Sequence, residues 1–362
     1  MPIRSTLRPP ALEAGALPGQ APALAGGPLS FAACEAVARE GEGDASHEVA
    51  RNRIEPAEAV AWARRFGPAC AREAERQLAA LSAPRTPFVG LAMDRPRVMG
   101  IINVTPDSFS DGGDRFDTGR AVADGLAMHE AGAEILDVGG ESTRPGAASI
   151  DAEEEMRRTL PVVRALADAG ARVSIDSRRA AVMAAALEAG ARIVNDVTAL
   201  THDPGSLPLV AQSEAAVVLM HMQGEPHTMQ TNPVYADAPL DIRDYLAARV
   251  EACVAAGLPL GRIAVDPGIG FGKTLAHNLK VLDQLAVLHG IGCPIVLGVS
   301  RKSFMAKVVA GVAPKDRLPG SLAAGLAGLA RGVQILRVHD VPETLQAVAI
   351  WQAIRGDLGQ RP

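Results

Sequence analysis

Short apolar runs rich in Val and Ile recur between residues 98 and 340, and nearly every run ends in a polar or charged cluster. The runs do not alternate between apolar and polar positions, which is typical of strands buried on both faces of a parallel sheet. Eight such strands are predicted. With their terminal clusters they span residues 98–109, 135–146, 173–177, 193–197, 217–222, 263–273, 294–303 and 335–340.

The segments between these strands have helical patterning, as in 119–132 and 178–190, and both of these end in Gly, a common helix C-cap. Eight alternations of strand and helix over about 250 residues favour a closed barrel over an open sheet. We therefore predict an α/β fold of the (β/α)8 type, the TIM barrel.

The carboxyl ends of the strands in such a barrel form the active site, and the polar residues of this chain gather there. This layout indicates an enzyme. The predicted strand ends carry Asn103, Glu141, Arg144, Asp176, Asn195, Asp196, His221, Asp266, Lys302, Arg337 and His339.

The composition narrows the class of protein further. Hydrophobic residues make up 48% of the 362 residues, enough for a sizeable core, and with 3% aromatics that core must rest on aliphatic side chains. A net charge of −5, with no basic stripe interleaved with aromatics, argues against a nucleic-acid partner. No run approaches a membrane span, and the four cysteines lack CxxC or zinc spacing. We expect a soluble cytoplasmic protein.

The chain is expected to divide into an N-terminal extension, residues 1–94, and the barrel, residues 95–362. Residues 1–30 are dominated by Pro, Ala, Gly and Leu, a composition that favours irregular or mobile chain. Residues 31–82 look helical, most clearly over 55–66. We interpret the extension as an appendage that packs against the barrel or against a neighbouring subunit.

The glycine-rich segment 268–274 is similar to a phosphate loop, but it lacks the spacing. A Walker motif needs Gly where this chain has Pro267, and a GxGxxG motif needs Gly where it has Lys273. The better interpretation is a loop after Asp266 that lets the backbone approach a flat ligand, with Phe271 as an apolar wall. A simple turn at DPG remains the alternative.

Two sets of polar residues indicate the chemistry. Asp176, Asn195, Asp266 and Lys302 suit an aminopyrimidinone edge, which presents N–H donors to a carboxylate and a carbonyl oxygen to a cation. An internal ion pair is the alternative for each residue alone, but burying several unpaired charges is costly. The second set suits a pyrophosphate, because guanidinium groups match phosphate oxygens. It comprises Arg144, Arg301, Arg337 and His339, with Asn103 opposite. For His339 a purely structural role stays open, and His221 is taken as lining.

The motifs NVTPDSFSDGG (103–113) and GGESTRPGA (139–147) resemble the two signature loops of the dihydropteroate synthase family. The resemblance continues through SIDS, NDV, LMHMQG, DPGIGFGK, SRKS, GSLAA and RVHDV and covers about residues 95–357. Ile269 departs from the family, which often has Phe there, but the position stays apolar.

The resemblance implies a transferase of folate biosynthesis. Such an enzyme condenses 6-hydroxymethyl-7,8-dihydropterin pyrophosphate with 4-aminobenzoate and releases 7,8-dihydropteroate and pyrophosphate. It further implies Mg²⁺ as cofactor and a homodimer, to which the apolar segment 344–354 could contribute.

The resemblance also implies residue roles. The pterin would be held by Asp176, Asn195, Met220, Asp266, Lys302 and Arg337. The pyrophosphate would be bound by Asn103, Arg144 and His339, with Asn103 also a ligand to Mg²⁺. The aminobenzoate would lie among Phe109, Thr143, Pro145, Phe271 and Ser303. The catalytic set would be Asp111, Arg144, Asp176, Lys302, Arg337 and His339, and loops 104–118 and 141–150 would act as lids.

Two other functions remain open. A pterin-dependent methyltransferase on the same barrel would account for the pterin residues, but not for the STRPG, NVTPDSFSDGG and RVHD segments. A non-catalytic pterin-binding paralogue would be favoured by the loss of a loop residue, and none is lost in this sequence.

Overall fold

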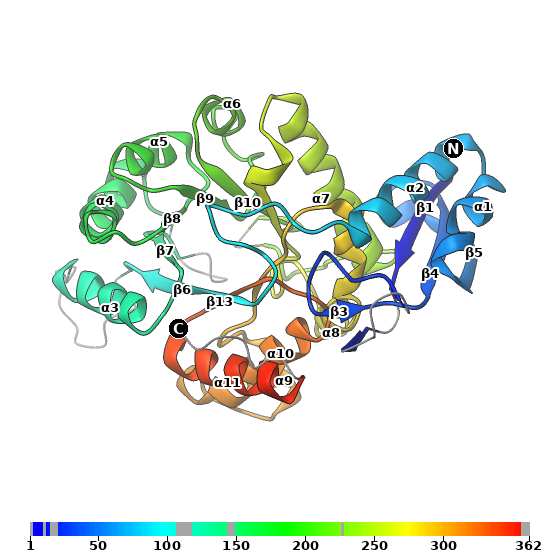
Figure 1. The fold of residues 1–362 in the computed structure, drawn as a ribbon. Coiled ribbons are helices and arrows are strands. Elements are labelled where there is room, and N and C mark those ends of the chain that lie inside the picture. The colour runs from blue at the N-terminus through cyan, green and yellow to red at the C-terminus, as the bar shows by residue number, and fades with distance from the viewer. Residues whose placement is uncertain are drawn as a thin grey trace.

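The computed structural model describes residues 3–9, 12–14, 21–105, 118–142, 149–225 and 228–355. Its main feature is a parallel eight-stranded sheet ordered β11-β10-β9-β8-β7-β6-β13-β12 (Figure 1). The strands are β6 (Arg97–Asn103), β7 (Ile135–Gly139), β8 (Val173–Asp176), β9 (Ile193–Asp196), β10 (Ala216–Met220), β11 (Ile263–Asp266), β12 (Val296–Gly298) and β13 (Ile335–Val338).

The two edges of this sheet meet, which closes the barrel. Val265 of β11 and Ile295, just before β12, form a parallel bridge, and the Val265 N–H donates to the carbonyl oxygen of Pro294 at 2.9 Å. All eight predicted strands are confirmed. Their continuous apolar runs are buried between an inner core and an outer layer of helices.

Helices cover the outside of the barrel. They are α3 (Thr118–Glu130), α4 (Ala152–Asp168), α5 (Ala180–Glu188), α6 (Ser206–Gln212), α7 (Ala238–Ala255), α8 (Leu275–Asp283), α9 (Phe304–Val308), α10 (Leu318–Leu329) and α11 (Val341–Ile354). The helices predicted over 119–132 and 178–190 are confirmed as α3 and α5. Gly132 and Gly190 follow them with φ of +109° and +110°, a left-handed conformation that favours glycine.

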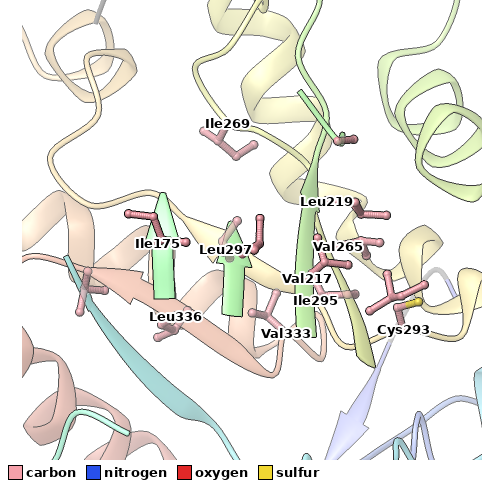
Figure 2. Packing of buried hydrophobic residues seen from close by; sticks show 14 of the residues in the cluster. Ile175, Val217, Leu219, Val265, Ile269, Cys293, Ile295, Leu297, Val333 and Leu336 are labelled. Atoms are coloured by element: carbon pink, nitrogen blue, oxygen red, sulfur yellow. The ribbon is translucent and has the colours of Figure 1, made fainter. Parts of the chain in front are cut away.

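Two apolar layers hold the barrel together. Figure 2 shows part of the outer layer, in which strand residues such as Val217, Leu219 and Leu336 are packed among other buried side chains. The inner layer contains Ile135, Ile193 and Ile335, the first residues of their strands, together with Phe88 and other residues of the segment that precedes β6. That segment therefore packs into the amino end of the barrel and leaves the carboxyl end for chemistry.

The N-terminal extension is built on an antiparallel sheet, so the helical prediction for residues 31–82 is wrong in its first half. The sheet has the order β1-β4-β5, from β1 (Ile3–Arg8), β4 (Cys34–Glu40) and β5 (His47–Ile54). Only α1 (Ala59–Arg64) and α2 (Pro68–Ser82) confirm the prediction. A short pair, β2 (Glu13–Ala14) and β3 (Leu29–Ser30), completes the strands.

The physical reason lies in β4, where Cys34, Ala36 and Ala38 alternate with other residues and pack in one core with Leu7 and α2. The alanines suggested a helix, but pairing with strands on both sides overrides that local preference. The expectation of little order in residues 1–30 is likewise wrong for β1, whose Leu7 is fully buried.

Figure 1 shows the extension beside the barrel, and ion pairs join it to α7. The guanidinium of Arg39 donates to Asp241 at 2.5 Å and to Asp244 at 2.6 Å, and Arg243 donates to Glu73 of α2 at 2.6 Å. Both arginines are buried. The extension therefore packs against the barrel as an appendage of the same chain.

Two further observations concern the expectations about the cysteines and about membrane spans. Cys34, Cys70, Cys253 and Cys293 are all buried and unpaired. Within the ranges that the structure describes, no helix has the length and apolar character needed to cross a membrane.

Candidate active site

Three charged residues and one amide from neighbouring strand ends form a connected cluster. The Arg337 guanidinium, on β13, donates from Nε to Oδ2 of Asp137 at 2.6 Å and from Nη2 to Oδ2 of Asp176 at 2.7 Å. The Asn195 amide, on β9, donates to the same oxygen of Asp137 at 3.0 Å. Asp176, Asn195 and Arg337, which we predicted to share a site, are thus brought together.

Asp266 and Lys302 lie beside this cluster. The Asp266 carboxylate accepts a hydrogen bond from the Gly268 N–H at 2.7 Å. At Gly298, a Cβ atom would lie 3.7 Å from the Asp266 carboxylate and 3.9 Å from Cδ of Arg337, so this strand end passes between the two side chains. The ammonium of Lys302 lies 4.2 Å from the ring centroid of Phe271. The charge of Arg337 acts on both Asp266 and Lys302, so these two residues belong to the same cluster as Asp176 and Asn195.

Burial changes the proton affinities of this cluster. Burial raises the pKa of Asp176 to about 7, although the nearby Arg337 opposes the shift. Burial also raises the pKa of Asp266, against the opposing effects of the Gly268 N–H and Lys302. Burial lowers the pKa of Lys302 to about 8, with Asp266 opposing. Shifts of this kind are typical of functional sites.

A buried lysine, Lys273, binds the backbone of the glycine-rich loop 268–274. Nζ of Lys273 lies 2.9 Å from the carbonyl oxygens of Gly268 and Phe271, to which it donates, and 3.0 Å from Nδ1 of His221. With 2% of its surface exposed, Lys273 is out of reach of a phosphate, in agreement with the rejection of a phosphate loop. His221 lies beneath the loop as a support.

The glycines of this loop are required by close backbone contacts. Gly268 has φ of +66°, and a Cβ atom there would lie 1.9 Å from the carbonyl oxygen of His221. At Gly272, with φ of +58°, a Cβ atom would lie 2.3 Å from the carbonyl oxygen of Gln223. The Tyr235 hydroxyl donates to the Gly272 carbonyl oxygen at 2.7 Å. The loop is therefore held in one conformation from both sides.

The proposed anion side contains Asn103 and His339. Nδ2 of Asn103 lies 3.4 Å from Nε2 of His339, and Nδ1 of His339 lies 2.9 Å from the Ser300 hydroxyl oxygen. Burial, followed by the charge of Arg301, lowers the pKa of His339 to about 3, so this imidazole is neutral at neutral pH. With Nε2 accepting from the Asn103 amide, the single N–H of the neutral imidazole is on Nδ1 and donates to the Ser300 hydroxyl, so an anion that binds His339 must replace one of these partners.

Arg301, which was predicted to join the anion-binding set, is paired with a carboxylate in this structure. Its guanidinium pairs with Asp340, with Nε donating at 3.1 Å, and its backbone N–H donates to the Ser321 hydroxyl. Arg301 has φ of +56°, a left-handed conformation that is uncommon for a residue with a side chain. Its role is to hold the turn after β12 against the turn after β13.

The other predicted site residues divide into two groups. Met220 is the last residue of β10 and is buried; its Cγ lies 3.3 Å from the place that a Cβ atom at Gly268 would take. Ser303 directly precedes α9. Five more lie outside the described residues: Phe109, Asp111, Thr143, Arg144 and Pro145.

Three further residues of the site were not predicted from the sequence: Asp137, Lys273 as a support for the loop, and Ser300. Asp137 stands inside the apolar run ILDVG, and a carboxylate within a strand buried on both faces is a usable signal, because such a charge needs partners. Lys273 follows a glycine-rich segment, a position that suggests a phosphate ligand and not a support for the backbone. Ser300 gave no signal, because serine is common at turns.

Comparison with known families agrees with this geometry. The family described as pterin binding enzyme matches residues 99–339. These residues are more than half of the chain, so the chain belongs to the family of pterin-binding enzymes.

Individual relatives define the family more narrowly. The dihydropteroate synthase of Escherichia coli (strain K12) is 44% identical over 264 residues, which are 73% of this chain and 93% of that protein. A Xanthomonas albilineans dihydropteroate synthase solved with 4-aminobenzoic acid is 44% identical with a TM-score of 0.70, covering 77% of this chain and 99% of that one. The same enzyme with 7,8-dihydropteroate gives 41% identity, a TM-score of 0.68 and coverage of 77% and 100%. The family is that of the dihydropteroate synthases.

Proposed function

We propose that this chain condenses 6-hydroxymethyl-7,8-dihydropterin pyrophosphate with 4-aminobenzoate, giving 7,8-dihydropteroate and pyrophosphate in folate biosynthesis. The observation that carries the proposal is that Asp176, Asn195, Asp266 and Lys302, from four places in the barrel, lie in one cluster around Arg337. The Xanthomonas albilineans relatives solved with 4-aminobenzoic acid and with 7,8-dihydropteroate support the two substrate classes.

The buried charges suit a pterin edge. The Asp266 carboxylate accepts from the ring N–H and the exocyclic amine, and the Lys302 ammonium donates to the carbonyl oxygen or to a ring nitrogen. The charges of Asp266 and Lys302 complement each other, since each opposes the pKa shift that burial imposes on the other. Bonds between charged and polar groups are stronger in such a buried space than in water.

The reaction breaks the bond between the pterin methylene carbon and the pyrophosphate oxygen, and the electron pair leaves with the pyrophosphate. The positive charge that develops on the carbon and the ring is stabilised by Asp176 and Asp266. The amine of 4-aminobenzoate donates its lone pair to the carbon and then loses a proton to solvent. Arg144 and His339 stabilise the charge of the departing pyrophosphate.

We propose Mg²⁺ as the cofactor, with Asn103 as its protein ligand. Nδ2 of Asn103 faces His339, so the carbonyl Oδ1 is the atom left to coordinate a cation, and oxygen ligands suit Mg²⁺. No group of three or more His, Cys, Asp and Glu residues in the described part of the chain could hold a metal ion. Mg²⁺ commonly completes its shell with substrate phosphates and water, and bound there it would neutralise pyrophosphate charge.

A homodimer and the cytoplasm complete the proposal. On α11, Ile350 and Ile354 are 59% and 80% exposed, and a second copy of the chain would cover such a surface. Four free cysteines suit the reducing conditions of the cytoplasm.

The test is incubation with dihydropterin pyrophosphate, 4-aminobenzoate and Mg²⁺, following pyrophosphate release and the formation of dihydropteroate. Product is expected only when all three are present. Methyl transfer from a reduced folate, without coupling of 4-aminobenzoate, would instead identify a methyltransferase. Tight pterin binding without turnover would identify a non-catalytic paralogue.

A further inference from the structure

Asp137 is a fully buried carboxylate below the candidate pterin pocket, and the mechanism above does not use it. One oxygen, Oδ2, accepts two hydrogen bonds, from Nε of Arg337 at 2.6 Å and from Nδ2 of Asn195 at 3.0 Å. The other oxygen, Oδ1, is buried and has no hydrogen-bond partner in the described structure. A single oxygen atom therefore connects two pocket residues from different strands.

The two carboxylates that bind Arg337 differ in accessibility. The side chain of Asp137 is 0% exposed, whereas that of Asp176 is 19% exposed. Each carboxylate takes a different part of the guanidinium, since Nε faces Asp137 and Nη2 faces Asp176. A pterin that bonds to Asp176 must compete with Nη2, but no ligand reaches Asp137. Only the bond to Asp176 is exchangeable.

Asp137 also sets the orientation of the Asn195 amide. A carboxylate oxygen accepts hydrogen bonds and cannot donate them, so Nδ2 of Asn195 must face Asp137. The carbonyl Oδ1 of Asn195, in the plane of the same amide, then points away from Asp137. Without Asp137, the amide could rotate and exchange its donor and acceptor.

We propose that Asp137 is the positioning residue of the pterin pocket: it holds Arg337 through Nε and fixes the Asn195 amide, while the Arg337–Asp176 bond opens when pterin binds. This inference rests on the proposed function, because it assumes a pterin ligand at Asp176. Asp137 itself touches no substrate. Its contribution is that Arg337 stays in place after it has released Asp176.

Two substitutions separate positioning from folding. Asp137→Asn keeps a carbonyl oxygen that can accept both hydrogen bonds, whereas Asp137→Leu has a similar volume and accepts neither. In the leucine variant the whole guanidinium turns to Asp176, and pterin must displace it. We expect the Kd for dihydropterin pyrophosphate to rise at least about 20-fold for Asp137→Leu and to stay within about fivefold for Asp137→Asn, from the usual range for bonds to charged groups.

Calorimetric titration measures the Kd and the fraction of binding-competent molecules separately. Asp283→Asn, at an exposed carboxylate on α8, is the matched control and should bind like the wild type. If Asp137→Leu lowers the binding stoichiometry but leaves the Kd unchanged, Asp137 serves folding alone and the proposal is wrong. An asparagine variant as weak as the leucine variant would also overturn it. If the wild type binds no pterin, both the proposed function and this inference fail.

A measurement on the wild type covers the case in which Asp137→Leu does not fold. The Nε–H signal of Arg337 in ¹⁵N-resolved NMR, assigned by its loss in Arg337→Lys, reports directly on the bond to Asp137. We expect slow hydrogen exchange of this group with and without dihydropterin pyrophosphate. Fast exchange in the bound state would show that Arg337 leaves Asp137 as well, and would refute the proposal.

Discussion

The ammonium nitrogen of Lys302 lies 4.2 Å from the centre of the Phe271 ring, so a side chain of the expected pterin site rests on a wall of the expected aminobenzoate site. A cation over an aromatic face is stabilised by the negative face of the ring. One contact therefore joins the two expected substrate sites. The glycine-rich loop, held from below by Lys273, presents the ring in this position.

Replacement of Phe271 by leucine should affect both substrates. It removes the wall of the expected aminobenzoate site, so the KM for 4-aminobenzoate should rise about tenfold or more, which corresponds to roughly 1.4 kcal/mol. It also removes the ring that stabilises the protonated form of Lys302, so the pKa of Lys302 should be lower in the variant. As the pH is raised, pterin affinity should then be lost at a lower pH than in the wild type. Steady-state kinetics and pterin titrations across alkaline pH test this. An unchanged KM for 4-aminobenzoate would contradict the assignment of Phe271.

Pterin affinity should be greatest between about pH 7 and pH 8. The pKa of Asp176 is raised to about 7, and its carboxylate must be ionised to accept donors from the ring, so its contribution is complete above that pH and is lost as the pH falls. The pKa of Lys302 is lowered to about 8, and its ammonium contribution is lost as the pH rises above that value. Calorimetry on both sides of this window gives the profile. The acid limb should disappear in Asp176→Asn, and a profile that keeps it would assign that limb to another group.

Asp266→Asn should leave the fold intact but weaken pterin binding by about 1.5 to 3 kcal/mol, the usual contribution of a hydrogen bond to a charged group. The amide offers one acceptor and one donor where the ligand edge presents only donors. The amide oxygen can still accept from the Gly268 N–H, so the loop should stay in place. Thermal melting and calorimetric titration separate the two effects, with Asp283→Asn as the exposed control. Wild-type pterin affinity in a folded Asp266→Asn variant would refute the assignment.

Lys273→Met should destabilise the protein and weaken pterin binding together. The variant leaves the carbonyl oxygens of Gly268 and Phe271 buried without their donor, and an unsatisfied buried group costs about 1 to 3 kcal/mol. The same loop carries Phe271 and the N–H that orients Asp266, so its displacement reaches the ligand. Lys307→Met, at an exposed position of α9, is the matched control. Loss of stability without any change in pterin Kd would limit Lys273 to a structural role.

The barrel could be predicted because each strand is a continuous apolar run that is buried on both faces. Asp176, Asn195, Asp266 and Lys302 could be predicted because strand ends of a parallel barrel meet at one face. The partners within the site could not be predicted in this way. The hydrophobic pattern of a sequence does not encode side-chain directions. It therefore cannot show which oxygen of Asp137 binds Arg337, or that Arg301 pairs with Asp340.

The extension was predicted less well, for a reason visible in β4. A segment such as CEAVARE has helical residues by composition, and only its pairing with β1 and β5 makes it a strand. The partner β1 lies more than twenty residues away along the chain, so no local window contains both.

The composition of residues 1–30 by itself suggests a tail that can be removed without loss of stability, but the structure indicates the opposite. Removal of these residues takes away β1, exposes one edge of β4, and breaks the bonds of Gln77 to the Leu7 N–H at 2.7 Å and to the Ser5 carbonyl at 2.9 Å. We expect a clearly lower melting temperature, since Gln77 is fully buried and loses partners on both sides of its amide.

The turnover of the molecules that remain folded should change by no more than about twofold, because the ion pairs of the extension run to α7 and not to the strand ends. Arg39→Ala is the companion variant, since it cuts the contact to Asp241 and Asp244 while leaving β1 in place. It should lower stability, because it leaves two largely buried carboxylates without the guanidinium that pairs with them. Thermal melting and activity per folded molecule test both variants. An unchanged melting temperature after removal of residues 1–30 would show that β1 contributes nothing to the extension, and a large loss of turnover in folded Arg39→Ala would show that α7 transmits the state of the extension to the active site.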